Sequence, residues 1–428
     1  MNISRRYLGD VFTIVVLTLA TGAGTSVFLN NNTSKAVAEG NSLVQVVWAG
    51  IYVIVAIRAA KNYRAIVEMI RENKFLVALV LLAVLSTIWS EDPGLTLRRS
   101  AALVGTTLFG VDFAVRYSIR DQLRLLAIAL GGIVALSVVV QVFFPGQIPT
   151  VDLAYPHAWV GLFEQKNVFA RIVVLATMVI LTAVRRSPGG ILTAVLAVAA
   201  AIGLIVATES MTSFLALGGM MLVLLLAPTL RWTARVRRAV QLFGAVIAAP
   251  ALYLLVHYRN SLTEMMGRNS SLTGRVQIWG YSLASIALKP ILGYGYSAFW
   301  VASAEATRID AALNWTVPHA HNAYIELALE LGLVGLATYV VAYLLAIKRA
   351  AVFMRLEPGN SAKWPLVYLC FVFLHSFTEN HFVVGNSIYW MLFVAAACSV
   401  TQVAPAFAWE DEDESEPAAE FGAPLVSS

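Results

Sequence analysis

The sequence predicts an all-α, polytopic integral membrane protein. Its composition, its long apolar runs and the placement of its charges are the three observations behind that prediction. Of 428 residues, 59% are hydrophobic and only 13% are charged. Soluble domains have about 45–50% apolar and about 25% charged residues. A chain with so few polar groups needs lipid as the solvent for much of its length.

About twelve apolar segments are long enough to cross a membrane. Because lipid offers no partner to a free backbone amide, each is expected to be helical. The Lys and Arg residues gather in alternate loops, which is the positive-inside pattern and predicts cytoplasmic N- and C-termini. The segments are residues 11–29, 43–57, 75–89, 100–115, 123–143, 168–184, 190–208, 213–230, 238–256, 323–347, 364–382 and 385–404.

We expect a membrane domain over residues 1–408 and a disordered acidic cytoplasmic tail over 409–428, which is acidic and lacks periodicity. One outward-facing loop, 257–322, is much longer than the others, and such loops are usually functional. Within it, Val276–Leu288 is predicted to form an amphipathic helix that Pro290 ends.

Several function classes lose support from the sequence. The net charge of +5 comes from loop residues that are not interleaved with aromatics, so no nucleic-acid partner is expected. No glycine-rich nucleotide motif occurs, which disfavours ATP-driven and nicotinamide-dependent chemistry, and we expect no cofactor. The two cysteines fall in apolar runs, where a disulfide or a thiol metal site is not expected.

The strongest chemical pattern lies where the long loop enters the next apolar segment. Asn322 is a plausible helix N-cap there. Asn322, Glu326 and Glu330 are four residues apart, so they share one helix face, and two carboxylates near the interface imply a polar cavity. His319 and His321 precede that face at the water boundary, where an imidazole could accept a proton from a sugar hydroxyl near neutral pH.

Two other interpretations of this pattern remain open. The histidines could be ordinary interfacial residues, with the glutamates paired to loop arginines. A His-x-His pair with a glutamate could also bind zinc. No third strong ligand with suitable spacing follows in the sequence, so no metal is expected.

Basic residues on the same outer side suit an anion. Arg275 follows Thr273-Gly, and its planar guanidinium fits a diphosphate. Lys166 and Asn167 open an apolar segment, near a helix N-terminus that favours anions, and Arg171 follows one turn later. The glycines of 289–296 either let backbone amides approach an anion or allow tight turns. An exposed arginine and interfacial cations are the plainer alternative.

Two outward turns carry acids. The first is Thr208–Ser213 and the second is His375–His381, which includes Glu379. These acids either line the mouth of the cavity or are solvated turn residues.

Together these motifs resemble the O-antigen ligase and Wzy-type polysaccharide polymerase superfamily. The resemblance covers residues 160–345, in the order of the family. A further segment resembles the ExoQ-like exopolysaccharide polymerases. The matching pieces are Gly161–Asn167, Thr208–Ser213, Thr273–Arg275 with Trp279, Lys289–Tyr296, His319–Gly335 and, for the ExoQ-like branch, Trp89–Pro93 with Leu97–Arg99.

The resemblance implies a GT-C-like, inverting, metal-independent glycosyltransferase at the periplasmic face of the bacterial inner membrane. Its donor would be an oligosaccharide on undecaprenyl diphosphate, and its partners would include other polysaccharide assembly and export proteins. His321, helped by His319, would act as general base or orient the acceptor, and Arg275 would hold the diphosphate. The other implied site residues are Lys166, Arg171, Asn167, Asn322, Glu326 and Glu379. Met211 departs from the family, which often has a basic residue there.

Three functions compete. A polymerase would join lipid-linked repeat units into exopolysaccharide or capsule. A ligase would transfer finished glycan to lipid A core or to protein. A transporter or flippase would need charged residues at mid-membrane depth on several helices, whereas the acids identified here cluster at the outer end of one helix. The segment from Trp89 to Arg99 favours the polymerase.

Overall fold

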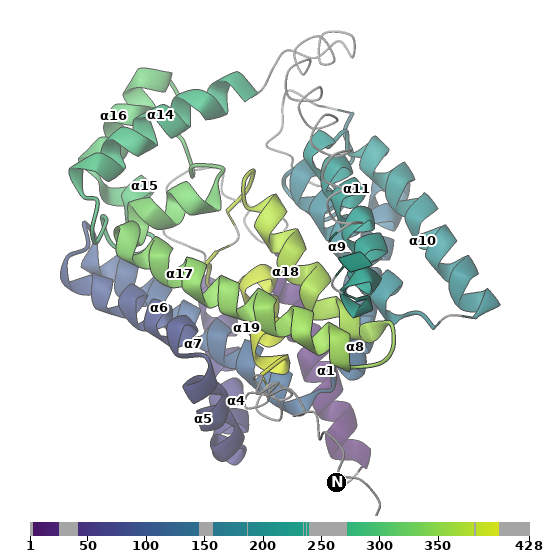
Figure 1. The fold of residues 1–428 in the computed structure, drawn as a ribbon. Coiled ribbons are helices and arrows are strands. Elements are labelled where there is room, and N and C mark those ends of the chain that lie inside the picture. Colours follow the sequence, from purple (N-terminus) through teal and green to yellow (C-terminus); the bar gives the residue numbers. More distant parts are fainter. Residues whose placement is uncertain are drawn as a thin grey trace, which may run out of the picture.

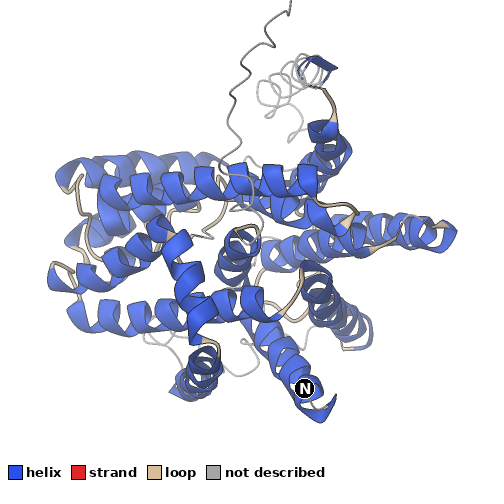
Figure 2. Cartoon of the chain, turned by 60° about the horizontal axis from the view of Figure 1, so that its bottom comes forward, coloured by secondary structure: helices blue, strands red, loops and turns tan. Residues whose placement is uncertain are grey.

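The computed structural model describes residues 3–24, 42–144, 157–185, 187–233, 272–380 and 382–401, together with residues 235, 236 and 238. Within these ranges the chain is helical and has no strand (Figure 2). The predicted all-α fold is confirmed.

Figure 1 shows the α-helices of the described ranges. They are α1 (Ile3–Ala20), α4 (Ser42–Lys61), α5 (Tyr63–Glu72), α6 (Lys74–Leu85), α7 (Pro93–Arg116), α8 (Ile119–Phe143), α9 (Lys166–Ala183), α10 (Pro188–Ala207), α11 (Met211–Leu226), α14 (Leu272–Leu288), α15 (Phe299–Ala302), α16 (Ala304–Leu313), α17 (Ala323–Leu356), α18 (Trp364–His375) and α19 (Ile388–Ser399). Three short 3-10 helices cover Ser86–Ile88 (η1), Ala227–Arg231 (η2) and Ser361–Lys363 (η3).

Six of the described helices are long and apolar enough to cross a membrane: Ser42–Lys61, Ile119–Phe143, Lys166–Ala183, Pro188–Ala207, Met211–Arg231 and Ala323–Leu356. Shorter apolar helices lie at Lys74–Ile88, Ser361–His375 and Ile388–Ser399. Each expected segment overlaps a helix, except 238–256, which lies almost wholly outside the described residues. The chain is therefore a multi-pass membrane protein.

Short polar side chains start many of these helices. An N-cap side chain accepts a hydrogen bond from a free amide in the first turn. Asp92 does so for Leu95 N of α7 (2.9 Å), and Pro93 then occupies the first helical position, where its missing N–H costs nothing. The remaining capping residues are Ser118 (α8), Ser187 (α10), Ser210 (α11), Ser303 (α16), Asn322 (α17) and Ser387 (α19).

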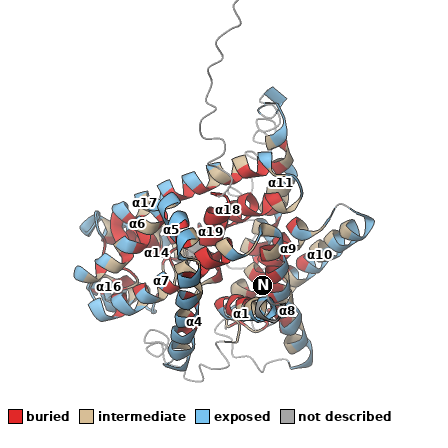
Figure 3. Ribbon diagram, turned by 90° about the horizontal axis from the view of Figure 1, so that it is seen from below, coloured by how far each residue is buried: buried red, intermediate tan, exposed pale blue. Residues whose placement is uncertain are grey.

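The core centres on α18 and α19, which carry large, fully buried aromatic side chains such as Trp364 and Trp390. Figure 3 shows buried residues concentrated there and on α9, and exposed residues on the outer helices. α19 packs on α7, α8 on α9, and α17 on α6. By contrast, α10 exposes apolar side chains such as Ile191 and Val195. An exposed apolar face of this kind suits contact with lipid.

α17 is interrupted at Gly332, where φ is 64° and ψ is −169°. The expected segment 323–347 contained no such break. Backbone groups freed by the break pair with the turn that follows α14, which keeps them satisfied. The bonds run from Leu333 N to Pro290 O (2.8 Å), Val334 N to Ile291 O (3.3 Å), Tyr294 N to Leu329 O (2.9 Å) and Gly295 N to Glu330 O (3.0 Å).

Two glycines make this close approach possible. A Cβ on Gly332 would lie 2.1 Å from the carbonyl oxygen of Ile291, and one on Gly293 would lie 2.5 Å from that of Leu329. Both glycines also have positive φ, which other residues rarely adopt. Of the two interpretations of the glycines in 289–296, the tight turn is therefore right, because the amides of Tyr294 and Gly295 are bonded to α17 and do not face an anion.

The segment from Trp89 to Arg99 docks on the same turn. Trp89 Nε1 donates to Leu292 O (3.0 Å), and Thr96 Oγ1 donates to Tyr296 O (2.9 Å). Arg99 donates to the carbonyl oxygen of Ser297 (2.8 Å). A side-chain pair between Glu91 and Lys289 joins the same two segments. The start of α7, the turn and the break in α17 therefore form one connected unit.

Candidate active site

Three parts of the chain far apart in the sequence meet at one carboxylate, that of Glu379 in the turn after α18. Ligand atoms of His319, His321 and Glu379 all lie within 4.8 Å of one another. The histidines come from the turn that precedes α17. Two arginines, from α9 and α14, approach the same carboxylate. Five residues singled out in the sequence are thus brought together.

Arg171 and Arg275 each lie 3.6 Å from a carboxylate oxygen of Glu379. The three side chains are only 16%, 17% and 9% exposed, respectively. Arg171 also stacks over the ring of Tyr389, at 5.2 Å from its centroid. Two guanidinium groups against one carboxylate leave excess positive charge in a largely buried place. Such a place attracts an anion, because low solvent exposure weakens screening.

The histidine turn has a constrained backbone. His321 has φ of 51°, a left-handed conformation that is uncommon outside glycine and often marks a functional site. Its amide donates to Nδ1 of His319 (3.1 Å), so a neutral His319 carries its proton on Nε2. Trp279 of α14 anchors the turn by donating from Nε1 to Ala320 O (2.9 Å). Among the described residues, the buried Nδ1 of His321 has no hydrogen-bond partner.

Both imidazoles are held in the neutral form. Burial, followed by the neighbouring His319, lowers the pKa of His321 to about 3, although the charge of Glu379 opposes the shift. Burial, followed by the charges of Arg171 and Arg275, lowers the pKa of His319 to about 4. At neutral pH each ring therefore has an unprotonated nitrogen that can accept a proton.

Glu326, in the first turn of α17, is hydrogen-bonded to the histidine turn that precedes this helix. Its Oε2 accepts hydrogen bonds from the backbone amide of Ala320 (2.8 Å) and from Trp300 Nε1 (3.0 Å), and it is buried. Glu330, one turn later, is also buried and has Arg99 as a charged neighbour. The helix face that carries Glu326 and Glu330 is thus shielded from lipid. Glu326 is thus bonded by a backbone amide and an indole, which differs from the alternative that paired both glutamates with arginines of the long loop.

The remaining predicted site residues are not part of the cluster at Glu379 but belong to the helix ends and turns next to it. Asn322 is the N-cap of α17, as expected, because its Oδ1 accepts from Tyr324 N (3.0 Å) and Ile325 N (3.2 Å). Lys166 is the first residue of α9 and is buried. Asn167 accepts a hydrogen bond from Ser210 Oγ (2.8 Å), which joins the 161–167 and 208–213 segments. Met211, next in the chain, is 42% exposed.

The histidine–glutamate cluster also has the spacing of a metal site. Glu379 is the third ligand that sequence spacing did not supply, since it comes from a turn after another helix. However, two guanidinium groups lie 3.6 Å from that carboxylate. Their charge opposes a cation at the same place. The electrostatics of the cluster therefore suit a bound anion better than a metal ion.

Residues 196–340 match the family model described as O-antigen ligase. Over this stretch the chain is similar to the O-antigen ligases. The predicted resemblance to the O-antigen ligase and Wzy-type superfamily, and to its ExoQ-like branch, is confirmed by two kinds of match. Within the matched stretch lie Arg275, both histidines and Glu326, whereas Arg171 and Glu379 lie outside it.

The individual proteins that this chain resembles are distant from it in sequence. It is 24% identical over 303 residues to "Exopolysaccharide production protein ExoQ" of Rhizobium meliloti (strain 1021), covering 64% of each chain. It is 26% identical over 139 residues to "Putative polysaccharide ligase" of Rickettsia prowazekii (strain Madrid E), covering 31% of this chain and 34% of that one. The matches thus span less than two thirds of the length of these relatives.

Two contributors to the candidate site are not predicted by the sequence. Trp300 bonds Glu326, and Tyr389 lies under Arg171. Neither belongs to a recognisable pattern, because each acts through a contact between distant segments. The sequence signal for this part of the site lies in the polar residues that they contact, Glu326 and Arg171.

Proposed function

We propose that the protein is a polysaccharide polymerase that joins undecaprenyl-diphosphate-linked repeat units into exopolysaccharide or capsule. The reaction would take place at the periplasmic face of the bacterial inner membrane, with both termini in the cytoplasm. The observation that carries the proposal is the cluster at Glu379, where two guanidinium groups and two neutral imidazoles surround one carboxylate.

In this proposal the arginines bind the diphosphate of the donor. The leaving diphosphate gains negative charge in the transition state, and fixed cations in a site of low exposure stabilise it. At 3.6 Å, the ion pairs with Glu379 are longer than hydrogen bonds, so Arg171 and Arg275 keep N–H donors for a substrate. Among the described residues, Arg171 Nε is buried without a hydrogen-bond partner. Lys166, at the N-terminus of α9, adds a further cation on the helix that carries Arg171.

His321 then acts as the general base. The acceptor hydroxyl oxygen attacks the anomeric carbon, the bond from that carbon to the diphosphate breaks, and the hydroxyl proton passes to the imidazole. One displacement of this kind inverts the configuration. A nearby anion favours the imidazolium form, so donor binding raises the pKa of His321 above its value of about 3 in the free protein. The base strengthens when the donor is in place.

A ligase that transfers finished glycan to lipid A core or protein is the second candidate. It is favoured by the name of the family model and by the relatives called polysaccharide ligases. The polymerase is preferred because the match to the exopolysaccharide production protein is the longer one. The segment from Trp89 to Arg99, which resembles that branch, also anchors the turn beside the site.

The test is the glycan profile of a deletion strain, compared with the same strain carrying His321→Ala or Arg275→Ala. A polymerase predicts loss of high-mass polysaccharide, with single repeat units left on the lipid carrier. Long glycan that is still made but stays on the carrier, with its final acceptor bare, would instead establish the ligase.

A matched control is Arg308→Ala on α16. Arg308 is 73% exposed and pairs only with Glu305, its neighbour one turn earlier, among the described acids. It should leave the profile unchanged, and immunoblots should show equal amounts of all variants in the membrane. Near-normal product from both His321→Ala and Arg275→Ala would refute the site assignment.

A further inference from the structure

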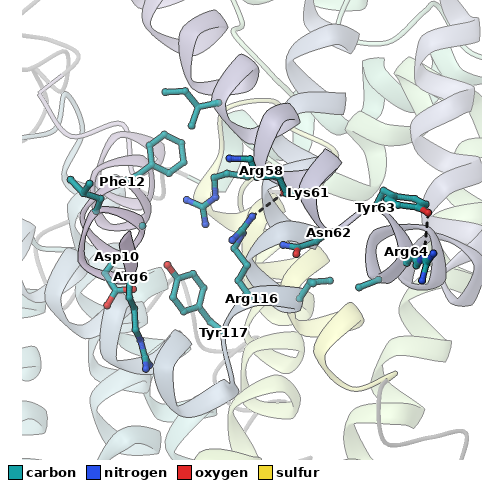
Figure 4. A pocket seen from close by; sticks show the side chains of 15 residues that line it. Arg6, Asp10, Phe12, Arg58, Lys61, Asn62, Tyr63, Arg64, Arg116 and Tyr117 are labelled. Carbon is teal, nitrogen blue, oxygen red and sulfur yellow. Dashed lines mark hydrogen bonds between the residues drawn. The ribbon is translucent and has the colours of Figure 1, made fainter. Parts of the chain in front are cut away.

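A cavity of about 1440 Å³ lies between α1, α4, α5 and the end of α7 (Figure 4). α7 starts beside the 289–297 turn and ends at Arg116, so its 24 residues separate the cavity from that turn by about 36 Å at 1.5 Å per residue. In Figure 1, α5 and the N-terminus accordingly lie at the opposite end of the molecule from α14 and α16. The cavity is thus distinct from the candidate active site.

Two arginines form the centre of the cavity around one buried acid. Asp112 of α7 has a side chain only 1% exposed, and it pairs with Arg58 (3.0 Å) and Arg116 (2.6 Å). Arg116 also donates to the backbone oxygen of Arg58 (2.9 Å). Figure 4 shows both guanidinium groups facing the space between α1 and α4. Two cations share one carboxylate here, so net positive charge remains.

A hydrogen-bond donor that has no partner among the described residues, in the arginine pair around Asp112, points to a ligand. Arg58 Nε is buried, and within the described residues it has no hydrogen-bond partner. The acid that lines the cavity, Asp10, is already paired with Arg124 (2.8 Å). Lys61 and Arg64 also line the cavity, and no ion pair involves either of them in the described part of the chain. A phosphate group is the anion whose oxygens match such guanidinium donors.

The other wall of the cavity is apolar. It is formed by Leu8 and Phe12 of α1, Ile54 of α4 and Val115 of α7. Arg58 lies over the Phe12 ring, 4.9 Å from its centroid, so the charged and apolar parts are contiguous. The neighbouring helix α5 buries Ile66 and exposes basic residues, which is typical of a helix at the membrane surface. A ligand at this depth can have a charged head and a hydrocarbon chain.

We propose that this cavity binds an anionic phospholipid, with its phosphate between Arg58, Arg116 and Lys61 and an acyl chain along the wall of Phe12, Ile54 and Val115. Basic pockets between membrane helices are known sites for anionic headgroups. A free phosphate ion would use only the charged half of the cavity. The apolar wall therefore favours the lipid.

The test uses the full-length chain in detergent, titrated with phosphatidylglycerol, with bound lipid measured by native mass spectrometry. Substituting Arg58 would leave buried Asp112 with one partner fewer and could unfold the protein. The variant of choice is therefore Lys61→Gln/Arg64→Gln, which removes two rim charges from exposed positions. Because each basic residue near a membrane surface contributes to anionic lipid binding, the affinity should fall about ten- to thirty-fold.

The matched control is Lys348→Gln/Arg355→Gln, which removes the same charges from exposed positions near the same end of the molecule, on α17 and outside this cavity. It should bind phosphatidylglycerol as the unmodified chain does. Equal weakening in the control, equal binding of phosphatidylcholine and phosphatidylglycerol, or release of the lipid by millimolar inorganic phosphate would each overturn the proposal. The last of these would identify a soluble phosphate as the occupant.

Discussion

Arg275 of α14 and Glu379 of the turn after α18 lie 3.6 Å apart. The pair ties the long loop to the helical core at the point where both histidines are found. Arg171 approaches the same carboxylate from α9. A single acid is therefore the shared ion-pair partner of two cations that come from different helices.

Glu379→Gln should lower glycan product at least tenfold and lower the melting temperature. Breaking a buried ion pair costs about 3–5 kcal/mol because a charge is left uncompensated, and here two guanidinium groups would repel each other. Product is measured in the complemented deletion strain, and melting is measured on the purified chain. Glu305→Gln, in the exposed pair on α16, is the control and should change neither. A fully active Glu379→Gln would contradict the proposed positioning of the arginines.

Gly332→Ala should destabilise the protein by more than about 2 kcal/mol, because a positive φ is strained for alanine and the new methyl group would overlap the Ile291 carbonyl. The melting temperature in detergent is the measurement. Gly203→Ala on α10 is the matched control, since a Cβ there meets nothing within 4 Å. Alanine favours a helix interior over glycine by up to about 1 kcal/mol, so the control should be neutral or stabilising. Equal melting of both variants would show that the break tolerates a side chain.

The pH dependence of kcat/KM should lack an acid limb near the ordinary pKa of histidine, about 6.5. This profile reports groups of the free enzyme, and the pKa of His321 there is about 3. As a base it is competent while unprotonated, which holds from neutral pH down to well below pH 5. Rates with a lipid-linked donor between pH 5 and 7.5 make the measurement. An acid limb centred near pH 6.5 would show that the imidazole is not held neutral.

Stability should fall as the pH falls from about 6.5 towards 4. In the unfolded chain the histidines take up protons below their ordinary pKa of about 6.5, whereas in the folded protein the pKa of His319 is about 4 and that of His321 about 3. The unfolded state therefore binds more protons in this window, and stability rises with pH. Urea unfolding at several pH values gives the slope. His319→Gln/His321→Gln should flatten it, and an unchanged slope would exclude these two groups as its source.

Asn322→Ala should destabilise the protein by about 1 kcal/mol, because two amides of the first turn of α17 lose their acceptor. Thermal melting measures the change. Asn322→Asp keeps an acceptor oxygen and should restore most of the lost stability. If the aspartate variant melts as low as the alanine variant, the side chain contributes by something other than capping.

Local patterns in the sequence predicted what depends on neighbours along the chain. The cap at Asn322 and the shared face of Glu326 and Glu330 depend on spacings of up to four residues, and both are found. The helical membrane segments follow from composition. The partners of Glu379 could not be predicted in the same way, because they come from α9, α14 and the turn before α17.

Other features were missed for identifiable physical reasons. A glycine in an apolar run does not by itself mark a break, so the interruption at Gly332 was not foreseen. The glycines near Gly293 admitted two interpretations until the backbone of α17 was seen beside them. Asp112 is the one acid in the expected segment 100–115, and no spacing within that segment indicates a partner for it. Its partner Arg58 comes from another helix, α4, so no local spacing connects the two.

Because of the break in α17, the position of the site does not depend on the thickness of the bilayer. A straight helix of 34 residues would measure about 51 Å, well beyond a hydrocarbon core of about 30 Å. The part after Gly332 is about 36 Å long and can cross the core without the first turns. Hydrophobic mismatch therefore acts on that part by tilting it. The turns that carry Glu326 and Glu330 are held instead by the backbone of residues 290–295, so their distance from the histidines does not depend on the lipid in which the protein resides.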